Sequence, residues 1–310
     1  MAQQTILKSV KYKWINTTNA SKKELTSIQK KYNLNQLDID DSYPAKKAQR
    51  PKISFRSDYI FIVLLFPYYD KKNAELRPSE IDIFLTKDTI ITIHRNKIKP
   101  LKDFFNKCQA DRDFRKKALN KSPDILLYHI FDLIYQNIFP MLDHISLDLN
   151  NLEKMIFAGN KKGTVEQIFI LKRNIVSFKT TMQVHKNIIR KFMHHNKLFT
   201  DNQNQLNVLF NDLVDYTKNI WDALEGYHLT INDLEKSYNS LATDKINTIM
   251  KTLTIFSVIV LPLTFICAIF TMDVSWMPIR DSYLDWHKIV GIQIIAIILM
   301  LLFFKRKKWL

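Results

Sequence analysis

Two long apolar runs near the end of the sequence dominate its pattern of hydrophobic and polar positions. Thr252 to Met272 is a run of 21 uncharged residues, and Ile289 to Phe304 is a run of 16. As a helix with a rise of 1.5 Å per residue, the first run is about 31 Å long, which matches the hydrocarbon thickness of a bilayer. The second run is shorter, but lysines at both of its ends can extend their charged heads to the membrane interface. We predict transmembrane helices at residues 251–272 and 287–305, joined by an external loop at 273–286.

The charges around these runs predict their orientation. A run of 16 apolar residues is also typical of a buried core helix, but the basic residues Lys305 to Lys308 directly after it favour a membrane helix. Between Asp273 and Asp285, three aspartates and one arginine give a net charge of −2. Because cytoplasmic flanks are enriched in Lys and Arg, we expect a multi-pass protein of the plasma membrane with both termini in the cytoplasm. Its basic cytoplasmic tail is predicted at 306–310.

The first third of the sequence mixes strand and helix patterns. Short runs of β-branched or alternating residues predict strands at 53–55, 59–66, 81–85 and 89–93. Ser21 stands three residues before Glu24, which is the spacing of a capping box and predicts a helix that continues to Lys31. We therefore predict a mixed α/β domain at residues 1–120.

From Pro123 onward the pattern is almost wholly helical, with a kink or turn predicted at Pro140. Apolar residues from Ile168 to Phe192 alternate spacings of three and four, which is a heptad seam, and His185 on this seam is expected to be a packed core residue. A second seam extends from Leu206 to Leu241, and no helix breaker except a single glycine separates it from the first apolar run. We predict a helical hairpin and stalk helix at 121–250. One helix of about 65 residues, roughly 100 Å long, would then extend from the cytoplasm through the bilayer.

Opposite charges are segregated on the two seams. Residues 154–197 contain ten basic residues against Glu166, whereas residues 201–235 contain seven acidic residues against Lys218. Such faces are suited to binding or steering ions, or to attracting each other as two antiparallel helices, and we favour the second interpretation. The adjacent residues His194 and His195 do not face each other on a helix, so they predict no metal site.

The composition excludes several classes of protein. Only four glycines occur in 310 residues, which nearly excludes glycine-rich nucleotide-binding loops. Cys108 and Cys267 are too few for a disulfide framework or, by themselves, for a tetrahedral zinc site. The net charge of +16 favours phosphate-bearing or membrane partners, but no nucleic-acid-binding module is recognisable. Since no nucleophile–base cluster is recognisable either, we expect no enzyme, no covalently bound cofactor and no nucleic-acid partner.

The stretch from Met250 to Phe270 carries a resemblance to a known family. It contains the block Pro262-Leu-Thr-Phe-Ile266 within the first apolar run, followed by Thr271-Met272-Asp273 and then Met277-Pro278. In these motifs the chain resembles the CorA family of divalent-cation channels and transporters. The resemblance implies a funnel-shaped fold in which an α+β cytoplasmic domain with long helices precedes two C-terminal transmembrane helices. It also implies a homopentamer in the lipid bilayer that moves Mg²⁺ by default, with Zn²⁺, Co²⁺ or Ni²⁺ as alternatives.

The sequence departs from this family at its signature, because Gly-Met-Asn is replaced by Thr271, Met272 and Asp273. In the family, the tripeptide turns the chain at the pore mouth and presents a ring of Asn side chains to the hydrated ion. The β-branched Thr271 does not readily adopt the positive φ that is open to glycine, so the turn must differ or be strained. A ring of Asp273 carboxylates would bind divalent ions more strongly and release them more slowly, which predicts altered selectivity. A solvated loop position is the alternative for Asp273.

The resemblance implies further pore residues, each of which would otherwise be interpreted as ordinary helix packing. Asn247 would form a polar ring near the cytoplasmic entrance, and Met250 and Leu253 would form a hydrophobic constriction. Leu261 would form a second apolar ring, and Thr264 would contact water bound to the ion.

The family's regulatory cation site, which is formed by carboxylates between neighbouring subunits, has no local motif in this sequence. Asp212 and Asp215 on the stalk helix are its candidates, with a solvated helix face as the alternative for both. We therefore expect a homopentameric channel or transporter in which a divalent cation is both the transported and the regulatory ion. A non-conducting, CorA-like membrane scaffold or sensor is the alternative function.

Overall fold

The computed structural model describes residues 3–8, 11–43, 50–119, 122–159, 163–195, 203–272, 285–307 and 309. The chain divides into two compact units, Met1–Glu235 and Lys236–Leu310. The first unit contains the sheet and most of the helices, and the second contains two long apolar segments. Each unit is described by itself.

A six-stranded mixed sheet forms the centre of the first unit, in the order β1-β2-β6-β5-β4-β3. Its strands are β1 (Gln3–Lys8), β2 (Lys13–Thr18), β3 (Lys52–Phe55), β4 (Tyr59–Asp70), β5 (Glu75–Thr86) and β6 (Thr89–His94). The pair β2–β6 is parallel, and the other neighbouring strands are antiparallel. The four predicted strands are confirmed, although β4 and β5 are longer than predicted. Strands β1 and β2 were not predicted, because polar residues interrupt the apolar pattern in both.

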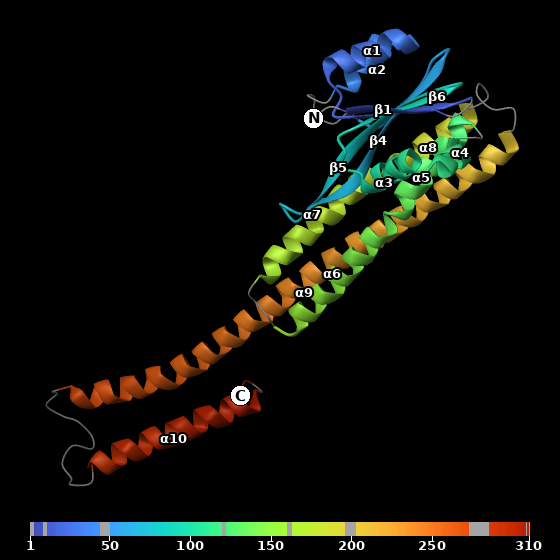
Figure 1. The fold of residues 1–310 in the computed structure, drawn as a ribbon. Helices are drawn as coiled ribbons and strands as arrows, with labels where there is room; N and C mark the ends of the chain where they lie inside the picture. The colour runs from blue at the N-terminus through green and yellow to red at the C-terminus, as the bar shows by residue number, and fades with distance from the viewer. Residues whose placement is uncertain are drawn as a thin grey trace. The chain divides into compact units, whose positions relative to one another are not determined.

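Two helices, α1 (Lys22–Tyr32) and α2 (Gln36–Asp41), cover one face of the sheet (Figure 1). Helix α1 begins at the predicted capping box: the Ser21 side chain accepts a hydrogen bond from the backbone N–H of Glu24, and the Glu24 carboxylate accepts one from the backbone N–H of Ser21. The cap satisfies backbone donors that the first turn leaves unpaired, and the helix ends at Asn33 in the left-handed conformation.

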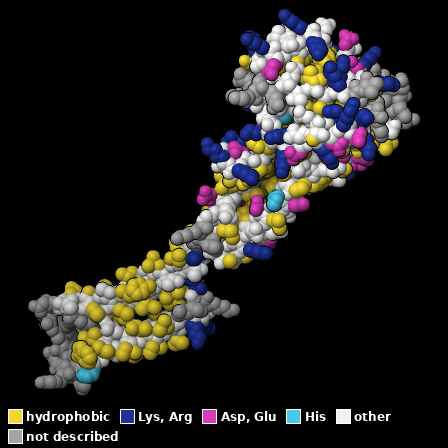
Figure 2. All heavy atoms as spheres, viewed as in Figure 1, with side chains coloured by type: hydrophobic (Ala, Val, Ile, Leu, Met, Phe, Trp, Pro, Cys, Tyr) yellow, Lys and Arg dark blue, Asp and Glu magenta, His cyan; other side chains and the backbone are white. Residues whose placement is uncertain are grey.

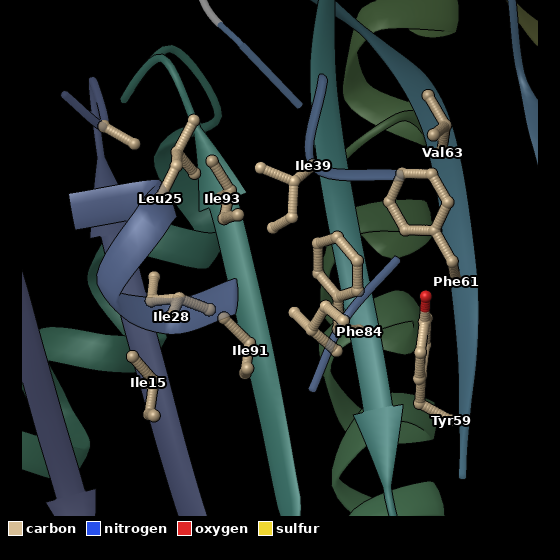
Figure 3. Packing of buried hydrophobic residues seen from close by; sticks show 12 residues of the cluster. Ile15, Leu25, Ile28, Ile39, Tyr59, Phe61, Val63, Phe84, Ile91 and Ile93 are labelled. Atoms are coloured by element: carbon tan, nitrogen blue, oxygen red, sulfur yellow. The ribbon is translucent and has the colours of Figure 1, made fainter. Parts of the chain in front are cut away.

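The core between these helices and the sheet is aliphatic and aromatic. Figure 3 shows Leu25 and Ile28 of α1 directed toward the strands, with Ile39 of α2 beside them. On the strands, Phe61 and Phe84 stack with ring centroids 4.5 Å apart. Burial of this cluster orders α1 and α2 on the sheet, because neither helix is long enough to be stable alone in water.

The remaining helices of the first unit are α3 (Lys99–Ala110), α4 (Arg112–Leu119), α5 (Pro123–Gln136), α6 (Phe139–Phe157), α7 (Thr164–Met182) and α8 (His185–His195). Helices α5, α7 and α8 contact the sheet, and α5 and α7 both lie against β5. Pro140 stands in the first turn of α6, directly after the break that ends α5, so the predicted turn is confirmed. The first heptad seam is buried as predicted, but it is divided between α7 and α8.

His185 is fully buried on this seam, which confirms the predicted core histidine. Its Nε2 lies 2.8 Å from the carbonyl oxygen of Leu65, and its Nδ1 lies 2.7 Å from the hydroxyl of Tyr135. Because a carbonyl only accepts, Nε2 carries the proton and Nδ1 accepts from the tyrosine. Burial lowers the pKa of His185 to about 4, so the ring is neutral at pH 7.

Helix α9 extends without interruption from Gln203 to Thr271, a length of 69 residues, which confirms the single long helix. Lys172 of α7 pairs with Glu235 of α9 at 2.6 Å, and Lys179 pairs with Glu225. The segregated charges therefore attract the two helices to each other, as the favoured interpretation predicted. Helix α10 (Asp285–Arg306) is the second apolar segment.

Replacing His185 tests the buried polar pairing. In His185→Leu, the Tyr135 hydroxyl and the Leu65 carbonyl both lose a buried partner, so we expect the free energy of unfolding to fall by about 2–4 kcal/mol. Urea titration of the full chain in detergent, followed by circular dichroism, measures the change. The matched control is His194→Leu at an exposed position, which should change it by no more than about 0.5 kcal/mol. Equal effects of the two variants would contradict the assigned contacts.

The depressed pKa of His185 also predicts a pH dependence. Between pH 6.5, the ordinary pKa of histidine, and about 4, the unfolded chain binds a proton that the folded chain does not, so native stability is lost as pH falls. The His185→Leu variant lacks this loss. The difference in unfolding free energy between native protein and variant should therefore shrink when the urea titrations are repeated from pH 7 down to pH 4.5. A constant difference would show that His185 keeps an ordinary pKa in the fold.

Candidate functional site

Three helices among the described residues are long and apolar enough to cross a membrane. The segment Pro123–Phe157, which holds α5 and α6, is 44% buried within its apolar window because its side chains pack inside the first unit. The corresponding windows of Gln205–Ile269 and Trp286–Arg306 are 0% and 6% buried. Figure 2 shows hydrophobic side chains over most of the visible face of the two apolar segments, at the lower left of the view. The apolar windows of these two helices are thus left uncovered by the described residues, and a bilayer or further copies of the chain must supply the cover.

A polar contact joins the two helices of this hairpin. Gln293, the strongly polar residue of the second apolar run, donates a hydrogen bond from Nε2 to Sγ of Cys267, 2.8 Å away. A side-chain amide in hydrocarbon needs a partner, and a contact between the helices provides one. Toward the other end of α10, the rings of Phe304 and Trp309 stack with centroids 6.0 Å apart.

The residues that the sequence assigns to a pore share one face of α9. At about 100° per residue, Asn247, Met250, Leu253, Leu261 and Thr264 fall within a sector of about 120°. The side chains of Met250, Leu253 and Leu261 are 61%, 64% and 68% exposed, and Asn247 and Thr264 are also exposed. Helical geometry thus aligns these five residues on a face that the rest of the chain leaves uncovered. Residues Thr254 and Ser257 lie in the same sector and were missed, although the helical period alone would have found them.

Threonine hydroxyls on this face are held by the helix itself. Thr264 donates from Oγ1 to the carbonyl of Val260 at 2.9 Å, and Thr254 donates to the carbonyl of Met250 at 2.8 Å. Each hydroxyl proton is thereby engaged, which leaves the oxygen lone pairs directed away from the helix as acceptors. Pro262 interrupts the same stretch and leaves the carbonyl of Val258 without its helical N–H donor.

Helix α9 ends at the altered signature. Thr271 is its last residue, and the Thr271 hydroxyl donates to the carbonyl of Ala268 at 2.8 Å. The backbone N–H of Met272 then bonds to the carbonyl of Ile269, which tightens the last turn. Thr271 is not among the described residues with positive φ, so the chain leaves the helix differently from a glycine turn and without that strain. Asp273 lies outside the described residues.

The two regulatory candidates, Asp212 and Asp215, lie exposed on the part of α9 that belongs to the first unit. Over the described parts of the chain, no three His, Cys, Asp or Glu side chains gather into a metal-binding group. Burial raises the pKa of the Tyr128 hydroxyl to about 12, with the carboxylates of Asp132 and Asp212 adding to the shift. One chain therefore offers separate carboxylates near Tyr128 but no complete cation site.

These features define a class of protein. A sheet-containing unit joined through one long helix to an apolar helical hairpin is the architecture of a membrane protein, and mixed polar and apolar groups along one face of a membrane helix are typical of ion channels and transporters. The family model for the CorA-like Mg²⁺ transporter protein matches residues 9–306. The chain therefore belongs to the CorA family, whose members are divalent-cation transporters and not enzymes, as the sequence predicted.

Individual relatives agree with this assignment. The cobalt/magnesium transport protein CorA of Thermotoga maritima is 27% identical, over 96% of this chain and 83% of that protein. The metal ion transporter YfjQ of Bacillus subtilis is 24% identical, over 96% of this chain and 89% of its own length. The complete structure of the CorA magnesium transporter from Methanocaldococcus jannaschii superimposes with a TM-score of 0.85 at 20% identity, covering 98% of this chain and 93% of that one. The predicted α+β fold on two C-terminal membrane helices is thereby confirmed.

Proposed function

We propose that this protein moves Mg²⁺, and Co²⁺ as a second substrate, across the plasma membrane through a pore formed by α9. The observation that carries the proposal is the face of α9 on which Asn247, Met250, Leu253, Leu261 and Thr264 align. This face begins with the amide of Asn247 and ends with the hydroxyl of Thr264, and both groups can accept hydrogen bonds from water bound to a cation. The apolar side chains between them form constrictions that can lose their water and act as a gate. The names of the Thermotoga and Methanocaldococcus relatives support Mg²⁺ and Co²⁺ as substrates.

A pore of this kind requires several copies of the chain. Two helices cannot enclose a water-filled path, and the exposed side chains of Met250, Leu253 and Leu261 would then face lipid with a polar amide and hydroxyl beside them. Assembly around an axis along α9 covers this face and turns each position into a ring. We propose the homopentamer of the family, with cytoplasmic segments at 1–120 and 121–250, the helices at 251–272 and 287–305, and both termini in the cytoplasm.

The mouth of the pore is the proposed site of altered selectivity. Thr271 and Met272 end the helix, and Asp273 follows directly in the sequence. Carboxylates in place of amides raise the affinity for divalent ions but slow their release. Zn²⁺, Co²⁺ and Ni²⁺ bind carboxylate oxygens more tightly than Mg²⁺ does, so they would then compete better at the mouth.

We further propose that Asp212 and Asp215 contribute to a regulatory cation site that a neighbouring subunit completes. Their exposure on α9 and the carboxylate of Asp132 near Tyr128 support this role, since oxygen ligands from two chains could then surround one hydrated cation.

Transport by the native chain and by Asp273→Asn tests the proposed function. Purified protein in liposomes should admit Mg²⁺ and Co²⁺, followed by an entrapped fluorescent indicator. In Asp273→Asn, the ratio of Mg²⁺ to Zn²⁺ flux should rise by roughly threefold or more, because a neutral ring releases the hydrated ion more readily. The control is Asp222→Asn, the same charge change at an exposed position of α9 within the first unit, which should leave this ratio unchanged. No flux of any of these ions through correctly assembled protein, with none restored by the variant, would favour the non-conducting scaffold.

Thiol accessibility tests the pore face. In a Cys267→Ser background, Leu261→Cys and Thr264→Cys should react with a small hydrophilic thiol reagent roughly tenfold faster than Ile259→Cys, because only the first two would face a water-filled path. Ile259 lies on the opposite side of α9 and serves as the matched control. The native Cys108 is buried and should not react. Equal rates at all three positions in the assembled protein would contradict the assigned face.

A further inference from the structure

A small polar pocket lies between α3 and the β1–β2 edge of the sheet, within the first unit. It has a volume of about 140 Å³. Its lining is Thr5, Asn16, Thr18, Asn96, Lys102, Phe105, Asn106 and Gln109. Every lining side chain except the phenyl ring can donate a hydrogen bond, and the single charged group in the lining is a cation.

The amide of Asn16 is fixed by a buried hydrogen-bond network. Trp14 donates from Nε1 to the hydroxyl of Thr92 at 3.0 Å, so that hydroxyl donates its own proton to Oδ1 of Asn16, 2.7 Å away. The backbone N–H of Asn96 donates to Nδ1 of His94, so the proton of that ring is on Nε2 and is donated to the same Oδ1 at 2.9 Å. Two donors therefore determine which end of the Asn16 amide is oxygen.

The other end of this amide faces the pocket. Asn16 is only 6% exposed, and its Oδ1 is held by Thr92 and His94 on the inner side. Because Asn16 lines the pocket, its Nδ2 is left for the pocket side, and the hydrogen bonds assigned to the described residues use only its Oδ1. This N–H group at the pocket wall is thus available to donate to an acceptor that enters the pocket.

Helix α3 supplies the opposite wall. Lys102, Asn106 and Gln109 follow one another at spacings of four and three, so they share one face of the helix. Within the described chain, Lys102 has no ion-pair partner. The neighbouring carboxylate, Asp103, is exposed and is not part of the lining. The wall thus presents one uncompensated positive charge together with two amides.

We propose that this pocket binds a phosphate-type oxyanion, held by Nζ of Lys102, Nδ2 of Asn16 and the amides of Asn106 and Gln109. The geometry is that of a donor-lined cradle: a cation would be repelled by Lys102, whereas the oxygens of an oxyanion can accept from several walls at once. The pocket admits a group the size of one phosphate. That group is either the free ion or the phosphoryl end of an organic phosphate, and the two share this recognition chemistry.

Calorimetric titration of the full chain in detergent with inorganic phosphate, in magnesium-free buffer, tests the site. We expect saturable binding that weakens roughly tenfold or more in Lys102→Gln, because a charge-assisted hydrogen bond is lost. Binding should disappear in Asn106→Asp, which places a carboxylate in the cradle. The matched control is Lys99→Gln, the same charge change on α3 outside the lining, which should alter affinity by less than about twofold. Gln109→Glu replaces Asn106→Asp if the latter fails to fold.

No saturable binding by the native chain, or binding that is unchanged in Lys102→Gln and Asn106→Asp, would overturn the proposal. Titration with glycerol 3-phosphate identifies the source: comparable affinity indicates an organic phosphate, and binding of the free ion alone indicates inorganic phosphate. Binding of malonate with no binding of either phosphate would overturn the assignment to phosphate. The titration measures binding and not ion flux, so its result is independent of whether the proposed transport occurs.

Discussion

Helix α9 has to be stable in two environments, first the packed core of the first unit and then the apolar surroundings of its C-terminal half. The rest of the structure depends on a sequence that suits both. In the first unit its seam is buried: Ile220, Leu224 and Ile231 are fully inaccessible, and ion pairs with α7 fix the helix laterally. Beyond Glu235 the helix has little cover of its own. Only a helix satisfies every backbone group within the same segment, so it can pass from a packed core into hydrocarbon without exposing unpaired amides.

The α/β unit gives this helix a rigid base, and buried polar groups specify its packing. His185 joins Tyr135 on α5 to Leu65 on β4, and it is neutral because burial disfavours its charged form. His94 is likewise buried, with its pKa lowered to about 4, and joins Asn16 to the loop after β6. Such contacts add little net stability compared with the aliphatic core, but misplacing them is costly. They therefore favour one register of helices on strands over alternatives that bury as much apolar surface.

The same logic separates the two surfaces that we propose to meet ions. Along α9 in the membrane segment, hydroxyl protons are bonded back to the helix, so the oxygens that remain are acceptors suited to hydrated cations. In the pocket beside α3, the acceptor oxygen of Asn16 is engaged internally and its donor is left, which suits an anion. In both places an internal hydrogen bond decides whether the side chain offers a donor or an acceptor to a ligand.

The amino-acid sequence by itself determined the elements that a single dominant period defines: the membrane runs, the seam that becomes α9, the capped helix after Ser21 and the four apolar strands. The resemblance of this stretch to a known family supplied the proposed pore residues from Asn247 to Thr264, and their common face follows from the helical repeat alone. Strands β1 and β2 needed the tertiary structure, since their polar residues carry no alternation: β2 is held by pairing with β6, and β1 is held by pairing with β2. The break between α7 and α8 and the orientation of the Asn16 amide were likewise decided by contacts between residues far apart in the sequence, with Asn16 and Thr92 separated by 76 positions. The local hydrophobic pattern predicts whether a segment is a helix or a strand. It carries no information about which donor or acceptor from a distant part of the sequence will bond to that segment.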